Sequence, residues 1–254
     1  MKRLFIFSLL FMATLATKAQ TYGDEGPTLV PNALGLVYEN AIERNEAGKV
    51  NIHRVNYQID GINVVANVYT PAGYDPFGKY AVVVVAHPNG GSKDQVAGLY
   101  AQKLAEAGFI TIAFDACYQG ESGGEPRRTD KPANRMGDIM GAVDFIQNYP
   151  GVDPERIGAF GICGGGGYTF ATDHADLIDQ PLPVIDGEIA DIRYMSEEAF
   201  AKASRTADKE LSIVPGATHI RTYFVEEYVD QISAKIKAFF TERLLEGLDG
   251  HNAV

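Results

Sequence analysis

The unbroken apolar run from Tyr80 to Ala86 (YAVVVVA) limits the fold of this chain more than any other feature. A run without polar alternation is typical of a strand buried on both faces, as in a parallel sheet covered by helices on both sides. Phe109 to Phe114 is a second apolar run, and a helix is predicted between the two runs, over about residues 94–107. Strands that alternate with helices predict an α/β domain with a mostly parallel sheet.

The same alternation continues along the rest of the chain. Asp60-Gly61 separates two segments rich in β-branched and aromatic residues, which predicts a hairpin over residues 52–59 and 62–70. Helices and strands are then expected in turn, at residues 134–148 (helix), 156–160 (strand), 165–178 (helix), 182–186 (strand), 196–204 (helix), 211–214 (strand) and 225–245 (helix). In such sheets the chemistry lies in loops at the carboxyl ends of the strands.

Residues 1–19 have the three parts of a secretory signal peptide. Lys2 and Arg3 precede an apolar run over residues 4–15, and small residues lead up to Ala19. The run is shorter than the roughly 20 apolar residues that a membrane span needs. We therefore expect cleavage after Ala19 and export to the periplasm or the extracellular space, with no membrane anchor on the mature protein.

The rest of the chain is expected to form an extension over residues 20–50, on the surface, and one domain over residues 51–247. The formal net charge is −11, and no cluster of Lys and Arg is present, which argues against nucleic acid as a partner. Two cysteines are too few for a Cys-ligated zinc site, and the histidines lack metal-ligand spacing. We therefore expect no metal and no cofactor, and a small molecule as the binding partner.

Gly161-Ile162-Cys163-Gly164-Gly165 has the form of the nucleophile elbow G-x-S-x-G, with Cys in place of Ser. This motif places a nucleophile on a sharp turn between a strand and a helix, where small neighbours are needed. The helix N-terminus lowers the pKa of the thiol, and the N–H of Gly164 can stabilise an oxyanion. The glycine spacing does not fit a dinucleotide loop. Two other interpretations of Cys163 stay open: a buried structural cysteine, or a disulfide with Cys117.

A cysteine nucleophile needs a base, and the base needs a group that orients it. His219 follows the last predicted strand, and Asp191 follows the strand before it, with Glu188 as the alternative acid. The chain order nucleophile, acid, histidine is the order found in hydrolases with a nucleophile elbow. The sequence therefore predicts a Cys163–His219–Asp191 triad.

The loop after the Tyr80–Ala86 strand is expected to supply the second N–H of the oxyanion hole. Pro88 has no N–H, so Asn89 or Gly90 is the candidate donor beside Gly164.

Three segments together resemble one known group of enzymes. They are similar to a subgroup of the α/β-hydrolase superfamily. The segments are residues 87–128 (HPNGGSKDQVAGLYAQKLAEAGFITIAFDACYQGESGGEPR), residues 152–168 (VDPERIGAFGICGGGGY) and the tail with its motifs ADIRYMSEEAF and VPGATH. That subgroup is close to dienelactone hydrolases and Xaa-Pro dipeptidyl-peptidase-like hydrolases, and it includes thiohydrolases and polyketide-transferase-like proteins. The resemblance implies an α/β-hydrolase fold, the roles given above to Cys163, Asp191 and His219, and hydrolysis of activated esters, lactones or thioesters through an acyl-enzyme.

The segment between Cys163 and Asp191 is shorter than the family pattern. The family has a further strand–helix unit and a lid here, whereas this chain has room for one helix and the strand 182–186. Losing an inner strand exposes the edges of its two neighbours, or moves strand 182–186 into the vacancy. Two consequences stay open: a homodimer formed by strand exchange, and a catalytically impaired or vestigial protein whose triad is not assembled.

Overall fold

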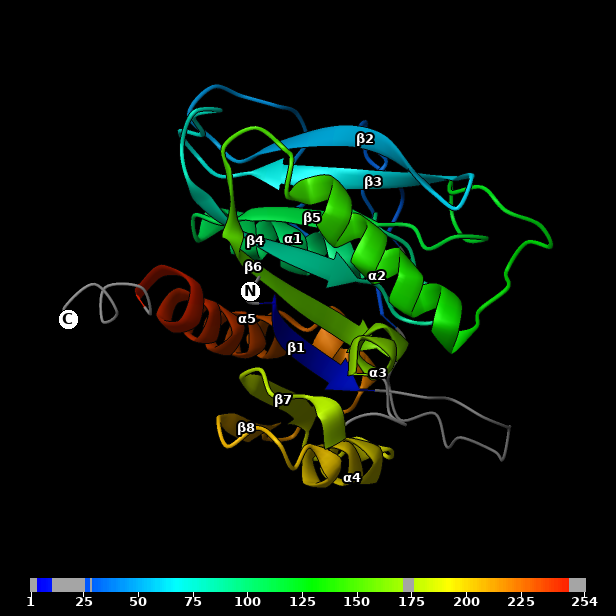
Figure 1. Ribbon diagram of the computed structural model, residues 1–254, viewed down its shortest axis with the longest axis vertical. Helices are drawn as coiled ribbons and strands as arrows, with labels where there is room; N and C mark the ends of the chain where they lie inside the picture. Colours follow the sequence, from blue (N-terminus) through cyan, green and yellow to red (C-terminus); the bar gives the residue numbers. More distant parts are fainter. Residues whose placement is uncertain (1–3, 11–25, 28, 171–175, 247–254) are drawn as a thin grey trace.

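The computed structural model describes residues 4–10, 26–27, 29–170 and 176–246. Among these residues one sheet has eight strands in the order β2-β3-β5-β4-β6-β1-β7-β8, with helices on both faces (Figure 1). The strands are β1 (Leu4–Leu10), β2 (Asn51–Ile59), β3 (Ile62–Thr70), β4 (Tyr80–Ala86), β5 (Ile110–Phe114), β6 (Val152–Cys163), β7 (Leu182–Gly187) and β8 (Lys209–Val214).

The helices follow the predicted alternation. They are α1 (Val96–Glu106), α2 (Pro132–Ile146), α3 (Gly164–Phe170), α4 (Arg193–Lys202) and α5 (Glu226–Phe240), with a 3-10 turn at Ile220–Tyr223 and a π-helical end at Thr241–Glu246. β2 and β3 pair antiparallel, as do β3 and β5, and the other pairs in the sheet are parallel. The predicted α/β domain with helices on both faces of a mostly parallel sheet is therefore present.

The core has one layer on each face of the sheet. Successive side chains of a strand point to opposite faces, so the valines of β4 divide between the two layers. Val83 and Val85 belong to the layer that contains residues of α1 and α5, and Val82 and Val84 belong to the layer that contains residues of α2. All four are fully buried, which explains why the sequence of this strand is apolar without alternation.

β1 lies where the sequence predicts a vacancy. Its backbone runs parallel to β6, from Leu4 opposite Ile157 to Leu10 opposite Cys163, and it also pairs with β7 at Ser8 and Val184. Figure 1 shows it between β6 and β7. The expectation that β6 and β7 expose their edges, or that residues 182–186 move into the gap, is therefore wrong for the described structure. Cleavage after Ala19 stays a prediction, and Ala19 lies outside the described residues.

Residues 29–50, which belong to the expected surface extension, are mostly half-buried or exposed, but two of their side chains are buried. Leu36 and Tyr38 are buried in the layer that contains α1. The Tyr38 hydroxyl donates a hydrogen bond to Gln102 Oε1 at 3.0 Å, on α1. This segment is therefore packed on the domain, next to the site described below.

Candidate active site

Cys163 lies at a sharp turn between a strand and a helix. It is the last residue of β6, and α3 begins at Gly164. Its φ is +56°, in the left-handed region that residues with a Cβ rarely adopt. The side chain is only 5% exposed. A strained residue at the carboxyl end of a central strand is the backbone arrangement that a nucleophile elbow requires.

The glycines around Cys163 are required by close backbone contacts. A Cβ on Gly161 would collide with the backbone of Gly165 and Gly166, and one on Gly165 would collide with the carbonyl oxygens of Ala86 and His87. β6, α3 and the loop after β4 therefore approach more closely than any residue with a side chain would allow.

The loop after β4 lies against the thiol. Backbone hydrogen bonds from Gly164 and Asn89 to Cys163 favour the thiolate, as does a side-chain hydrogen bond from Tyr223. Burial has the larger effect and raises the pKa of the Cys163 thiol above its ordinary value. The structure thus brings the predicted oxyanion donors Gly164 and Asn89 to the sulfur. Gly90 lies in the same turn with a φ of +70°.

Arg135 holds the loop after β4 through hydrogen bonds to His87. It is buried in α2, and its Nη1 donates to His87 Nε2 at 2.9 Å while its Nη2 donates to the His87 carbonyl. Burial, and then the charge of Arg135, hold the pKa of His87 well below its usual range, so this imidazole is neutral. A neutral His87 accepts both from Arg135 and from the N–H of Ala116 at 3.2 Å.

His219 lies directly before the 3-10 turn Ile220–Tyr223 and is 6% exposed. Burial lowers its pKa to about 4, and the charge of Asp191 opposes this change only in part. The imidazole is therefore neutral at physiological pH. Its Nε2 lies 2.7 Å from the Tyr223 hydroxyl.

The two candidate acids differ in their contacts. Asp191 lies between β7 and α4, is exposed, and acts on His219 through its charge. Glu188 Oε2 accepts a hydrogen bond from the N–H of Gly216 at 2.9 Å, which ties it to the loop after β8. Of these two candidates, Asp191 is therefore the carboxylate whose charge acts on His219.

The two cysteines are both free and buried. Cys163 belongs to the core layer with α1, whereas Cys117 belongs to the layer with α2 on the opposite face. The Cys117 N–H donates to Asp138 at 3.1 Å, and burial raises the pKa of the Cys117 thiol to about 12. The alternative of a Cys117–Cys163 disulfide is therefore wrong for this structure.

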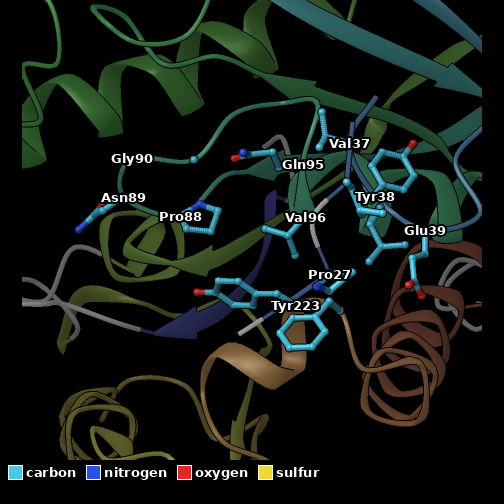
Figure 2. A pocket seen from close by; sticks show the side chains of 15 residues that line it. Pro27, Val37, Tyr38, Glu39, Pro88, Asn89, Gly90, Gln95, Val96 and Tyr223 are labelled. Atoms are coloured by element: carbon cyan, nitrogen blue, oxygen red, sulfur yellow. The ribbon is translucent and has the colours of Figure 1, made fainter. Parts of the chain in front are cut away.

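A pocket of about 520 Å³ opens beside the loop after β4 and Tyr223. Figure 2 shows the turn Pro88–Gly90 on one side of it and Val37–Glu39 on the other, with Tyr223 at its base. Apolar side chains, among them Val37, Val96 and Leu99, form much of its lining. The pocket is therefore suited to an apolar group bound next to Asn89 and Gly90.

Three carboxylates in the loops after β4 and β5 are close enough together to hold a metal ion: Asp94, Asp115 and Glu121. The Nζ of Lys93, which is fully buried, lies 2.7, 3.1 and 2.5 Å from their oxygens. The ammonium group contacts all three carboxylates, so the cluster forms an ion-pair network that joins the loops after β4 and β5.

Sequence reasoning missed Tyr223 and Arg135. A tyrosine four positions after His219 is the signal that could have indicated the first, because residues i and i+4 meet on a helical turn. Nothing in the local pattern around Arg135 distinguishes it from an exposed helical arginine. Its role depends on how α2 packs under the loop after β4.

A family model described as "Dienelactone hydrolase family" matches residues 64–180. The uncharacterised protein YcjY of Escherichia coli K12 is 52% identical over 108 residues, which cover 42% of this chain and 35% of YcjY. The thiohydrolase aneE of Aspergillus aculeatus is 31% identical over 108 residues, which cover 42% of this chain and 32% of aneE. The chain thus spans about a third of the length of these curated relatives.

Solved structures give the same fold. The hypothetical protein PA2218 of Pseudomonas aeruginosa superposes with a TM-score of 0.68 at 26% identity, covering 77% of this chain and 94% of that one. A dienelactone hydrolase from Anabaena variabilis superposes with a TM-score of 0.62 at 18% identity, covering 76% and 98%. The fold is therefore that of an α/β-hydrolase. No helix in the described part of the chain has the length and apolar character to cross a bilayer.

Proposed function

Because residues 64–180 of this chain match the model of the dienelactone hydrolase family, we propose that the protein hydrolyses activated esters, lactones or thioesters with Cys163 as the nucleophile. The observation that carries this proposal is the placement of Cys163. It lies on a left-handed turn, with hydrogen bonds from Gly164 and Asn89 at its sulfur and a neutral His219 linked to it through Tyr223.

The reaction begins when His219 accepts the thiol proton. The thiolate attacks the acyl carbon, and the N–H groups of Gly164 and Asn89 stabilise the oxyanion, with Gly90 as the alternative donor. The leaving group takes the proton back from His219 and departs, which leaves a thioester on Cys163. Water then attacks this thioester, His219 accepts its proton, and the acid product leaves as the thiol re-forms. The charge of Asp191 stabilises the imidazolium in both halves of the cycle.

Activated acyl groups suit this site better than amides do. A thiolate is a better leaving group than an amine, so an amide needs strong protonation of its nitrogen before its bond breaks. The relative named as a thiohydrolase supports thioesters as one substrate class.

A catalytically impaired protein is the second candidate. The shortness of the segment between Cys163 and Asp191, which leaves no room for the further strand–helix unit and lid of the family pattern, favours it. In that case the fold and the thiol remain, but no acyl group is transferred to the thiol.

One experiment separates the two candidates. The protein is mixed with p-nitrophenyl acetate, quenched in acid and analysed by mass spectrometry of its peptides. We expect a burst of p-nitrophenol and an acetyl group on the Cys163 peptide, both lost in Cys163→Ala and both kept in the control Cys117→Ala. An unmodified Cys163 with no burst would leave only the impaired protein.

Export through residues 1–19 is also proposed. Lys2, Arg3 and the apolar run before Ala19 support it. The full chain is expressed in a bacterium, and the periplasmic fraction is analysed by N-terminal sequencing. We expect a chain that begins at Gln20; an intact N-terminus in the cytoplasmic fraction would contradict export.

A further inference from the structure

The Tyr223 hydroxyl contacts both the proposed nucleophile and the proposed base. It lies 2.7 Å from His219 Nε2 and shares a hydrogen bond with the Cys163 thiol. The 3-10 turn Ile220–Tyr223 produces the contact with His219. It brings the rings of His219 and Tyr223 together edge to face, with centroids 5.2 Å apart and an angle of 73° between the ring planes. Figure 2 shows Tyr223 extending beneath the turn that carries Pro88 and Asn89.

We propose that Tyr223 is a catalytic residue that carries the proton between Cys163 and His219. This inference rests on the proposed function, since it takes Cys163 as the nucleophile and His219 as the base. The hydroxyl is both a donor and an acceptor, so it can bond to the two groups at once. Phenylalanine has the same shape and lacks this ability.

The proton transfer is balanced. The thiol S–H bond breaks and its proton bonds to the Tyr223 oxygen, while the original hydroxyl proton leaves that oxygen and bonds to His219 Nε2. The products are a thiolate, an imidazolium and an unchanged neutral tyrosine. The reverse transfer returns the proton when the thiol re-forms at the end of the reaction.

The surroundings favour a neutral tyrosine in this position. Burial, and then the neighbouring Cys163, raise the pKa of Tyr223 well above its ordinary value, so the hydroxyl passes a proton without holding a negative charge. Three charged groups act on the three partners: Arg135 from α2 on Cys163, Asp191 on His219, and Asp186 from β7 on Tyr223. Arg135 favours the thiolate and Asp191 favours the imidazolium, so both promote the transferred state.

The test compares Tyr223→Phe with the control Tyr228→Phe. The Tyr228 hydroxyl donates to the Gly216 carbonyl at 2.9 Å and is not a member of the proposed proton path. Alkylation of Cys163 by iodoacetamide is followed by peptide mass spectrometry from pH 5 to 9. We expect Tyr223→Phe to alkylate at least about tenfold more slowly at pH 7, with its rate profile moved to higher pH, and Tyr228→Phe to match the wild type.

An unchanged or faster alkylation of Cys163 in Tyr223→Phe would overturn the proposal. The hydroxyl would then have no part in the proton transfer between Cys163 and His219, or would hinder it. Alkylation needs no turnover, so its rate is independent of the acetyl burst. If the wild type gives no burst but Tyr223→Phe is alkylated more slowly than the wild type, the proposed function is refuted and the proton path is kept.

A second measurement does not depend on the folding of the variant. The rate of the p-nitrophenol burst of the wild type is measured in mixtures of H₂O and D₂O, because acylation couples the transfer of the thiol proton to attack on the acyl carbon. A path through the hydroxyl moves two protons and gives a curved dependence on the deuterium fraction, whereas a linear dependence would contradict it.

Discussion

His219 is buried as a neutral imidazole, and protonating it in the folded protein is unfavourable. Its ordinary pKa of 6.5 falls to about 4 in the folded protein, mainly because of burial. The unfolded chain therefore binds a proton at this side chain at a higher pH than the folded chain does. By linkage, its contribution to stability is complete above pH 6.5 and is lost as the pH falls towards 4.

This gives a prediction for His219→Gln. As the pH falls from 7 to 4, the free energy of unfolding of the wild type should fall relative to that of the variant by up to about 3 kcal/mol. Urea unfolding at several pH values measures the difference. His87 is present in both proteins, so its own buried imidazole cancels. Parallel stability curves would show that His219 is not desolvated as described.

At the scale of elements, the junction of β6, α3 and the loop after β4 depends on glycine. A Cβ on Gly165 would meet two carbonyl oxygens, whereas one on Gly137, within α2, would meet nothing within 4 Å. Gly165→Ala should therefore lower the free energy of unfolding by about 1–3 kcal/mol or more. Gly137→Ala, the matched control, should raise it by about 0.5–1 kcal/mol. Urea unfolding measures both, and a neutral Gly165→Ala would contradict the close approach.

Elements with a strong local signal could be predicted from the sequence. β4 has the predicted bounds because an apolar run ends at the polar loop that follows it, and the hairpin of β2 and β3 turns at Asp60-Gly61 as expected. Both signals act within a few residues. The positions of Cys163 and His219 at strand ends follow from the same alternation, although their roles in catalysis stay predictions.

What depends on distant contacts could not be predicted. An apolar N-terminal run is consistent with a signal peptide and with a strand, and only the free place between β6 and β7 distinguishes them. The burial of Leu36 and Tyr38 depends on α1. The contact between Tyr223 and Cys163 depends on how the 3-10 turn after β8 meets the end of β6.

The strand β1 gives a prediction for truncation. A chain that begins at Gln20 lacks the partner of β6 and β7, so we expect it to lose a few kcal/mol of stability and to melt roughly 10 °C below the chain that begins at Met1. Exposed strand edges also favour association, so the shorter chain should form more dimer. Thermal melting and size-exclusion chromatography with light scattering test both expectations. Equal melting temperatures would show that β1 contributes nothing to the sheet.

The net charge of the full chain is −11, so an anionic ligand that approaches the protein is repelled. Glu39 lies at the pocket and adds to this negative potential. We expect kcat/KM for an anionic ester, p-nitrophenyl hemisuccinate, to rise as salt screens the repulsion, and that for neutral p-nitrophenyl butyrate to stay nearly constant. Glu39→Gln should reduce the salt effect for the anion. Equal salt dependence for the two esters would contradict electrostatic selection.

The register of β1 links maturation to architecture. The backbone of Leu10 lies opposite Cys163, so the same few residues that would address the chain for export also flank the nucleophile. A peptidase that removed these residues would remove a strand of the sheet together with the export signal. The precursor and the trimmed enzyme would then be two differently built proteins encoded by one gene, separated by a single cut.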